Sequence, residues 1–215
     1  MDHRECMERI RDTGVIAIMR AKSSEQLLRA ADAIRAGGVG VIEVTMTTPG
    51  ALSVIEQAVS RYGKEVLFGA GSVLDAESAR AAILAGAQFV VSPSFKASLV
   101  EICRRYSVPV MPGAFTPTEI LTTWECGADM VKVFPASLGG PSLIKAIKAP
   151  LPQVELVPVG GVNLENTADF IRMGAAAIGV GSALVSQKLL DSGDFDTLTK
   201  RARRFVAEIA RGRAD

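Results

Sequence analysis

Short apolar runs recur along the chain and alternate with longer amphipathic stretches. Eight of the runs have the length and β-branched content of strands: GVIAIMR (14–20), GVIEVT (40–45), VLFGAG (66–71), QFVVSP (88–93), VPVMPG (108–113), DMVKVFP (129–135), ELVPVGG (155–161) and AAIGVGS (176–182). The stretches between them, such as SSEQLLRAADAIRAGG and DAESARAAILAGA, carry apolar residues at helical spacing. Repeated alternation of strand and helix predicts a parallel sheet with helical crossovers.

A weak internal repeat supports this organisation. Gly37, Gly86, Gly127 and Gly174 each stand at the end of an expected helix, where a left-handed C-cap favours glycine. They recur at roughly 40 to 50 residues, which is about two strand–helix units each. We therefore predict a closed (β/α)8 TIM barrel that occupies residues 1–215 as a single α/β domain, with an N-terminal helix and a C-terminal closing helix.

The main alternative is an open, doubly wound sheet with a nucleotide site. In that fold a strand is followed by G-x-G-x-x-G at the start of a helix, with an acidic residue after the next strand. No expected strand of this chain continues in that way, and GVGS near residue 180 is too short a match. The pattern therefore favours the barrel.

Composition and charge narrow the range of partners. The 215 residues are 48% hydrophobic and 22% charged, with a formal net charge of +1. This balance gives no electrostatic reason to expect a nucleic acid or an anionic membrane as a partner. The charged stretch MDHRECMERIRDTG lacks the apolar core of a signal peptide, and no apolar run is long enough to span a bilayer. A cytoplasmic location is the resulting prediction.

Histidine and cysteine usage argues against a metal site. His3 is the sole histidine, and Cys6, Cys103 and Cys126 are too scattered for a zinc site or a disulfide framework. We therefore expect three free thiols, no metal cofactor and a chemistry that does not depend on a histidine base.

Polar residues at the ends of the expected strands are the candidates for chemistry, because the active site of a barrel lies at the carboxyl ends of its strands. Side chains alternate between the two faces of a strand, so three sets share a face: Ile16, Ile18 and Arg20; Val41, Glu43 and Thr45; Met130, Lys132 and Phe134. If these faces point inward, Arg20, Glu43 and Lys132 share one cavity.

A lysine in such a cavity must either pair or lose its proton, because an unpaired buried cation costs several kcal/mol. A lysine whose pKa falls from about 10.4 toward 7 can attack a carbonyl and form a Schiff base, while a carboxylate such as Glu43 moves protons. A plain salt bridge between Lys132 and Glu43 is the structural alternative. Lys22 and Lys96 also follow strands and are rival nucleophiles, although both stand in loop-like settings.

Glycines after the last two expected strands form a second candidate site. Gly160 and Gly161 follow one strand and Gly181 the next, with Ser182 expected at the start of a helix. Backbone N–H groups in such turns bind phosphate in many barrels. Alternatively, the glycines serve only to make tight turns.

Seven segments carry a resemblance to a known family. They are GVGVIEVTMTTPGAL, GAGSVLDAESA, VVSPSF, MPGAFTPTE, KVFPAS, PVGGVNLEN and GVGSALV. Their types and order resemble those of the 2-keto-3-deoxy-6-phosphogluconate (KDPG) aldolase and 4-hydroxy-2-oxoglutarate (KHG) aldolase family, from about Val15 to Val185.

The resemblance implies a metal-independent class I aldolase that cleaves KDPG to pyruvate and glyceraldehyde 3-phosphate, and also KHG to pyruvate and glyoxylate. It implies that Lys132 forms the Schiff base and that Glu43 is the general acid/base. Homotrimers are common in the family, so a homotrimer is also implied. The remaining residues implied in binding are Arg20, Thr47, Ser72, Pro93, Phe134 and Val159 for the substrate, and Gly160, Gly161, Gly181 and Ser182 for its phosphate.

Two positions depart from the gluconate-type pattern. Thr47 stands where some relatives have arginine, and Arg20 is then the candidate for the missing charge. Val159 stands where several gluconate-type enzymes have threonine and phosphogalactonate aldolases have valine. An aldolase for the galactonate epimer, with the same mechanism, is therefore an alternative.

More distant alternatives are an isomerase or epimerase on a phosphate-binding barrel and a non-catalytic barrel that binds sugar phosphates. The first would have to work without the histidines that many such sites use, and the presence of both Glu43 and Lys132 speaks against the second.

Overall fold

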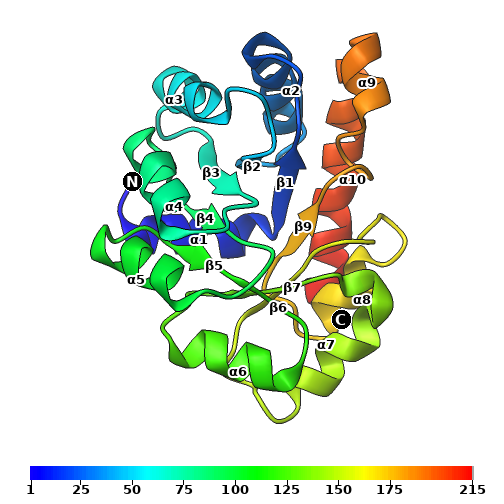
Figure 1. The fold of residues 1–215 in the computed structure, drawn as a ribbon. Helices are drawn as coiled ribbons and strands as arrows, with labels where there is room; N and C mark the ends of the chain where they lie inside the picture. Colours follow the sequence, from blue (N-terminus) through cyan, green and yellow to red (C-terminus); the bar gives the residue numbers. More distant parts are fainter. Residues whose placement is uncertain (215) are drawn as a thin grey trace.

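The strands lie inside and the helices outside in the computed structural model, which describes residues 1–214 (Figure 1). The strands are β1 (Val15–Met19), β2 (Val41–Thr45), β3 (Leu67–Gly71), β4 (Val90–Val91), β5 (Val110–Met111), β6 (Gly113–Ala114), β7 (Val131–Val133), β8 (Leu156–Pro158) and β9 (Ile178–Val180). The helices are α1 (His3–Thr13), α2 (Ser24–Ala36), α3 (Ala51–Tyr62), α4 (Ala76–Leu84), α5 (Ala97–Arg105), α6 (Pro117–Glu125), α7 (Gly140–Lys148), α8 (Thr167–Arg172), α9 (Gln187–Ser192) and α10 (Phe195–Ala214), with a 3₁₀ turn, η1 (Ala136–Leu138), before α7.

The strands form a curled, parallel arrangement, as the alternation of strand and helix predicts. One sheet has the order β5-β4-β3-β2-β1-β9 and the other β6-β7-β8. Parallel bridges from Leu156 to Ala175 and from Val159 to Gly179 join β8 to the β9 region. The α/β single domain is therefore confirmed, whereas the eight strands of one closed sheet are observed only in part.

Pro112 accounts for the break between the two sheets. It separates β5 from β6 within the single strand expected at 108–113. Proline has no N–H to donate to a neighbouring strand, so the ladder is interrupted at this residue. The Pro112 carbonyl still accepts a hydrogen bond from the Lys132 N–H at 2.9 Å, which keeps β7 beside this segment.

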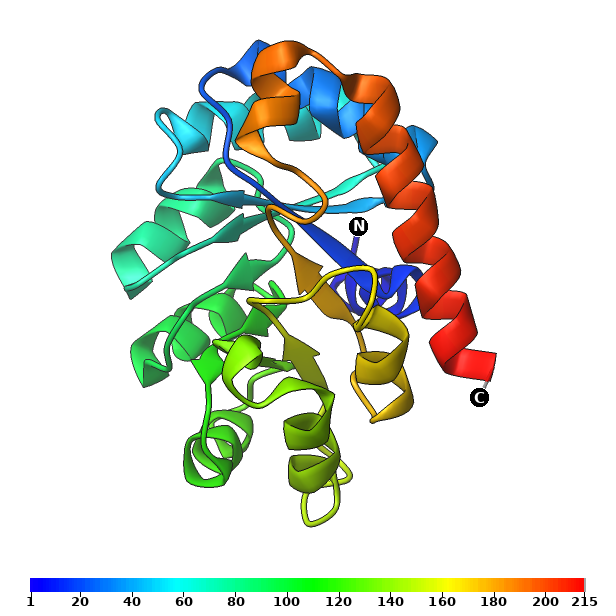
Figure 2. The ribbon, with the colours of Figure 1, turned by 90° about the vertical axis from the view of Figure 1, so that its right-hand side faces the viewer.

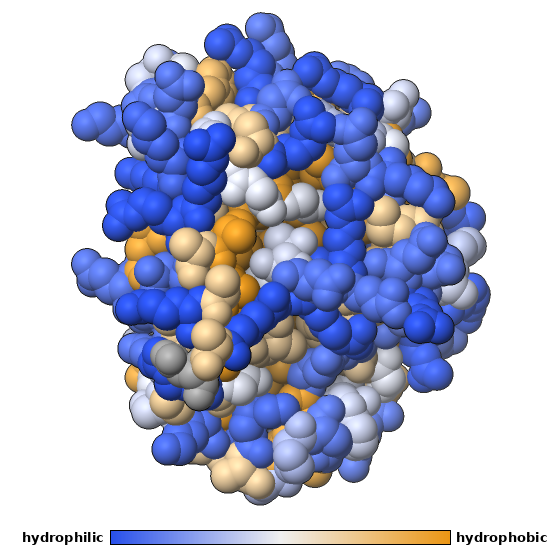
Figure 3. All heavy atoms as spheres, turned by 180° about the vertical axis from the view of Figure 1, so that it is seen from behind, coloured by the Kyte–Doolittle hydropathy of each residue, from blue (hydrophilic) through white to orange (hydrophobic). Residues whose placement is uncertain are grey.

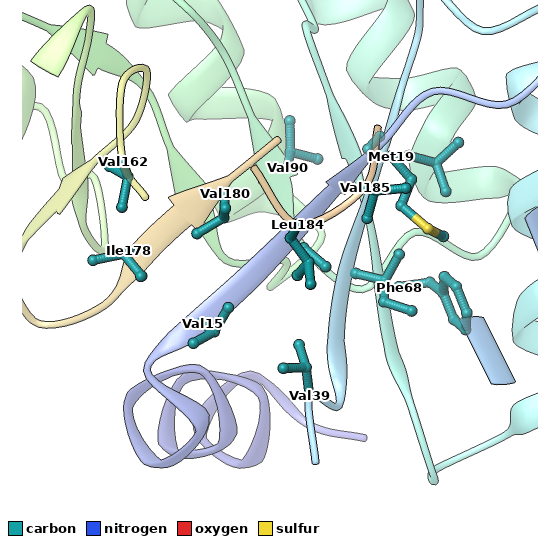
Figure 4. Close-up of a cluster of buried hydrophobic side chains, with 14 of the residues drawn as sticks. Val15, Met19, Val39, Phe68, Val90, Val162, Ile178, Val180, Leu184 and Val185 are labelled. Atoms are coloured by element: carbon teal, nitrogen blue, oxygen red, sulfur yellow. The ribbon is translucent and has the colours of Figure 1, made fainter. Parts of the chain in front are cut away.

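Two apolar layers lie on opposite faces of the strands. The outer layer joins the strands to the helices; it includes Val15 and Met19 of β1 and Val180 of the neighbouring strand β9 (Figure 4). The inner layer contains Ile16, Ile18, Val41, Leu67, Phe89, Val91, Met111, Met130, Val157, Val159 and Ala177, with Cys6, Met7 and Ile10 of α1. Helix α1 therefore packs on the inner layer, and the predicted inward faces of β1, β2 and β7 are confirmed.

Helix ends follow local chemistry. Thr116 caps α6 in a capping box with Glu119, and Asp2 does the same for α1 with Glu5. The predicted left-handed glycines are confirmed at three of the four helix ends, listed here with their φ angles: Gly86 (96°), Gly127 (93°) and Gly174 (102°). The prediction for Gly37 is wrong because its φ is −85°, and the following residue, Gly38, takes the positive φ of 94°.

The C-terminal helix α10 closes the fold on one side, as expected. It packs against α2 and α8 and runs beside them in Figure 2. Leu198, Ala202, Phe205 and Ile209 form its buried stripe, and its basic residues lie mainly on the other face. Seen from behind, mostly hydrophilic side chains cover the molecule and hydrophobic ones show only between them (Figure 3). Within residues 1–214, no helix is long and apolar enough to cross a membrane.

Phe205 should contribute strongly to stability because its ring is fully buried in the α10 contact. Replacement of Phe205 by alanine should lower the free energy of unfolding by about 3–5 kcal/mol, through lost burial and the cavity left behind. Urea unfolding measures this loss. The exposed neighbour Arg204 is the control, and Arg204→Ala should change the free energy by no more than about 0.5 kcal/mol. Equal effects of the two substitutions would contradict the packing role of α10.

Candidate active site

Lys132 and Glu43 are the two buried charges on the inner face of the strands. Glu43 lies on β2 and Lys132 on β7, and their exposed fractions are 2% and 6%. Glu43 pairs in register with Ile18 of β1, and Lys132 with Gly113 of β6. Both side chains are thus buried on the inner face, as predicted, and each influences the charge of the other.

Burial shifts the pKa of both groups toward their neutral forms. It lowers the pKa of Lys132, partly offset by the Glu43 carboxylate, and the nearby Arg20 cation lowers this pKa further. It raises the pKa of Glu43, against the opposing influence of Lys132 and Arg20. Arg20, Glu43 and Lys132 thus act on one another electrostatically, as their shared face predicts.

The two charges interact without forming a salt bridge. Within residues 1–214, no hydrogen bond or salt bridge joins Lys132 to Glu43. Instead, Lys132 Nζ lies 5.1 Å from the centroid of the Phe134 ring. A plain ion pair between these two side chains is therefore not the arrangement in the described residues.

A cavity of about 510 Å³ is lined by Arg20 and Phe134. Its wall contains seven of the predicted site residues, together with five that were not predicted. The predicted ones are Arg20, Phe134, Val159, Gly160, Gly161, Gly181 and Ser182, and the additional ones are Ile18, Val162, Asn163, Gly179 and Ala183. Lys132 and Glu43 do not line this cavity, but Phe134, which Lys132 approaches, does.

Two asparagines form hydrogen bonds within the loop after β8. Gly160 and Gly161 have φ angles of 89° and 78°, which glycine adopts without strain. Asn166 Nδ2 donates to the Gly161 carbonyl at 2.9 Å, and Asn163 Oδ1 accepts from the Asn166 N–H at 3.1 Å. Sequence reasoning missed Asn163, although an asparagine shortly after a glycine pair is a recognisable turn signal.

The expected helix start at Ser182 is wrong. The segment forms a single turn, in which the Gly181 carbonyl accepts from Leu184 N–H at 3.0 Å and from Val185 N–H at 2.8 Å, and α9 begins only at Gln187. Within the described part of the chain, the N–H groups of Ser182 and Ala183 donate to no acceptor. The turn therefore still offers N–H groups at the cavity wall.

Three predicted substrate contacts lie outside the cavity wall. Thr47 is exposed after β2, and its Oγ1 lies 3.0 Å from the hydroxyl of buried Thr45. Ser72 follows β3 with a φ of 58°, a conformation that costs free energy in a residue other than glycine and is common at functional sites. Pro93 is half-buried after β4. All three follow strand ends.

The rival lysines lie elsewhere. Lys22 is exposed and its Nζ pairs with Asp191 at 2.8 Å, while Lys96 is exposed at the start of α5. His3 Nε2 lies 2.8 Å from Asp129 Oδ1 and so joins α1 to the segment before β7. Within residues 1–214, no three His, Cys, Asp or Glu side chains are grouped to hold a metal ion.

Comparison with known proteins agrees with the resemblance in the motifs. Residues 6–201 match the family described as KDPG and KHG aldolase. The chain is 38% identical over 203 residues to 2-dehydro-3-deoxy-phosphogluconate aldolase of Treponema pallidum, covering 94% of this chain and 95% of the relative. It is 37% identical over 171 residues to 2-dehydro-3-deoxy-6-phosphogalactonate aldolase of Escherichia coli, covering 79% and 83% of the two chains.

A solved structure also resembles this one. It is the KDPG aldolase of Legionella pneumophila with pyruvate captured as a covalent carbinolamine intermediate, and it superposes with a TM-score of 0.86. Its sequence is 30% identical, and the match covers 92% of this chain and 96% of that one.

The coupling of Glu43 to Lys132 predicts a dependence of stability on pH. Glu43 already has a raised pKa, and Lys132→Met removes the cation that restrains this shift. When a carboxyl has a raised pKa in the folded state, the protein loses stability as pH rises above the usual pKa of that carboxyl, which is 4.5. As pH rises from about 5 to 9, urea unfolding should therefore show Lys132→Met losing stability relative to wild type, by about 1.4 kcal/mol for each unit by which the Glu43 pKa rises further. Wild type adds to this difference, because the lowered pKa of Lys132 makes its ionised form costly below pH 10.5 and this cost fades as pH rises.

The double variant Glu43→Gln/Lys132→Met is the control for this series. It lacks the carboxyl, so its free energy of unfolding should not show the additional fall with pH. A Lys132→Met curve parallel to wild type at every pH would contradict the coupling.

Proposed function

The chain belongs to the KDPG and KHG aldolase family, and on this premise we propose that it cleaves KDPG to pyruvate and glyceraldehyde 3-phosphate through a Schiff base on Lys132. The observation that carries the proposal is the geometry around the lysine. Its amine is buried, has a lowered pKa, has Glu43 as an electrostatic partner and lies over the ring of Phe134, which lines a cavity large enough for a ligand.

Lys132 supplies the nucleophile in this reaction. Its neutral amine attacks the C2 ketone of the substrate to give a carbinolamine, which loses water to form an iminium. Desolvation lowers the pKa of the amine, so the neutral form is populated at lower pH than in an ordinary lysine. Covalent capture of pyruvate as a carbinolamine in the Legionella pneumophila enzyme supports this step.

Glu43 moves the protons. As a base, directly or through one water, its carboxylate takes the proton of the C4 hydroxyl as the C3–C4 bond breaks, the aldehyde forms and the bonding electrons enter the iminium to give an enamine. The protonated carboxyl then returns a proton to C3, and hydrolysis of the resulting imine releases pyruvate and free Lys132. The raised pKa of Glu43 suits both directions of transfer, because it brings the two protonation states closer in energy.

Recognition is assigned to the surrounding loops. Gly160, Gly161, Gly181 and Ser182 would bind the phosphate, since the two glycine loops meet on one cavity wall and carry N–H groups without acceptors. Arg20 is the charged group on that wall and could bind either the phosphate or the carboxylate. Thr47, Ser72, Pro93 and Phe134 are proposed to surround the pyruvyl half.

Two further substrates follow from this assignment. KHG, with cleavage to pyruvate and glyoxylate, needs the same chemistry without the phosphate. The galactonate epimer of KDPG is favoured by Val159, which lies on the cavity wall and offers no hydroxyl to distinguish the configuration at C4. Similar identities to a gluconate-type and a galactonate-type enzyme do not separate the epimers.

We also propose that the two sheets together act as one closed (β/α)8 barrel over the single domain, with the bridges between β8 and β9 in support. A homotrimer is proposed from the family resemblance. Leu84 on α4 is 70% exposed and Tyr106 after α5 is 40% exposed, so apolar surface is present that assembly could cover.

Trapping with pyruvate and borohydride tests the nucleophile. Reduction should leave a stable pyruvyl adduct that intact mass detects and peptide mapping places on Lys132, because borohydride reduces the iminium to a secondary amine. Lys132→Met should lose the adduct and the lyase activity, whereas Lys22→Met, the control at an exposed lysine, should keep both. An adduct on another lysine, or none on the folded protein, would exclude the proposed mechanism.

Ser182→Asp tests the phosphate assignment. The added carboxylate should repel the phosphate and raise the Michaelis constant for KDPG about tenfold or more, equivalent to about 1.4 kcal/mol, with much less effect for KHG. Ser182→Asn, which is similar in size and uncharged, is the matched control. Steady-state kinetics gives the Michaelis constants for both substrates. Equal changes for KDPG and KHG would show that the phosphate does not bind at this turn.

A further inference from the structure

Gly71 lies directly beneath the carboxylate of Glu43. A Cβ placed on Gly71 would be 1.7 Å from Glu43 Oε1 and 2.2 Å from its carboxyl carbon. In the register of the sheet, Gly71 is opposite Thr45, and Glu43 is opposite Gly69. The Glu43 side chain therefore leans along β2 toward the carboxyl end of the strands and crosses onto β3, over a residue that has no side chain.

Polar contacts do not hold the carboxylate in this place. Within residues 1–214, Glu43 has no hydrogen bond and no salt bridge, so its orientation depends on packing and on attraction to Lys132 and Arg20. Steric restraint is strong here because protein interiors are close-packed. The free space over Gly71 thus decides where the carboxylate lies.

The glycine is not required by its backbone conformation. Its φ lies outside the positive region, so alanine could adopt the same backbone, and the three atoms nearest to an added Cβ all belong to Glu43. Gly69, two residues earlier on the same strand and face, is different. A Cβ there would meet the Phe89 ring at 2.5 Å, in the apolar inner layer.

We propose that Gly71 is a positioning residue for the acid/base step: the absence of a side chain lets Glu43 lie over β3, where it faces the imine carbon chain on Lys132. This inference rests on the proposed function and adds to it the element that orients the carboxylate. Gly71 itself touches no reacting atom, and its contribution passes through Glu43.

The test separates Schiff-base formation from proton transfer. Adduct formation with pyruvate and borohydride reports on Lys132, and exchange of the pyruvate methyl protons with deuterated water, followed by NMR, reports on Glu43. Gly71→Ala should keep the adduct within about twofold of wild type but slow the exchange at least about tenfold, toward the roughly hundredfold loss expected of Glu43→Gln. The pH profile of exchange should also shift, because moving the carboxylate changes its burial and its distance from Lys132 and Arg20, which set its pKa.

A double-mutant cycle distinguishes positioning from general damage. Gly71→Ala should cost little in the Glu43→Gln background, because the group it displaces is already inactive. Gly69→Ala, the control on the same strand, should lower the melting temperature through the Phe89 contact, and its effect on exchange should multiply with that of Glu43→Gln. If Gly71→Ala folds poorly, Gly71→Ala/Glu43→Asp should recover stability, because the shorter side chain withdraws from the clash.

The outcomes are distinct. Wild-type exchange in Gly71→Ala, or multiplication of its effect with Glu43→Gln, would overturn the inference while the adduct on Lys132 preserved the proposed function. If Gly71→Ala folds poorly, no recovery of stability in Gly71→Ala/Glu43→Asp would overturn it as well. Absence of the adduct in the wild-type protein would overturn the Schiff-base proposal and this inference with it.

Discussion

The burial of a lysine and a glutamate on the same inner face of the strands is the constraint on which the rest of the structure depends. Each charge alone would cost several kcal/mol in this apolar interior. Here each offsets part of the cost of the other without a direct bond, and burial still shifts both pKa values toward the neutral forms. The pair therefore retains a reactive amine and a carboxyl that can exchange protons, which a tight ion pair would suppress.

The interior is divided into two parts, and the stability of one offsets the free-energy cost of the charges buried in the other. Toward the amino ends of the strands, the inner layer is apolar and α1 covers it with Cys6, Met7 and Ile10. Toward the carboxyl ends, Gly71 has no side chain and so leaves room for the Glu43 carboxylate. Stability thus comes from one end and from the outer helix contacts, so the other end is free to hold groups that destabilise the fold.

Strand positions could be predicted from the sequence because period-two alternation is set by the backbone itself. That rule placed Glu43 and Lys132 on inward faces, and the structure confirms it. Loop geometry could be predicted less well from the sequence, because it depends on contacts between segments that are distant in the chain. The turn at Ser182 was mistaken for a helix start, and Asn163 was missed because its role depends on hydrogen bonds with Asn166. The break in the sheet at Pro112 could have been predicted, because proline has no N–H to donate a hydrogen bond to a neighbouring strand.

This difference between strands and loops bears on substrate choice. Lys132 and Glu43 are fixed by strands whose register a change of one residue would invert, so the chemistry tolerates little variation. The phosphate and aldehyde ends of the substrate are assigned to loops and to Val159 at a strand end, where a substitution alters contacts without moving the sheet. A family with one carbon–carbon bond chemistry and several keto acids is the expected outcome of this separation. The strands therefore fix the chemistry, whereas a few wall residues are left to select the epimer.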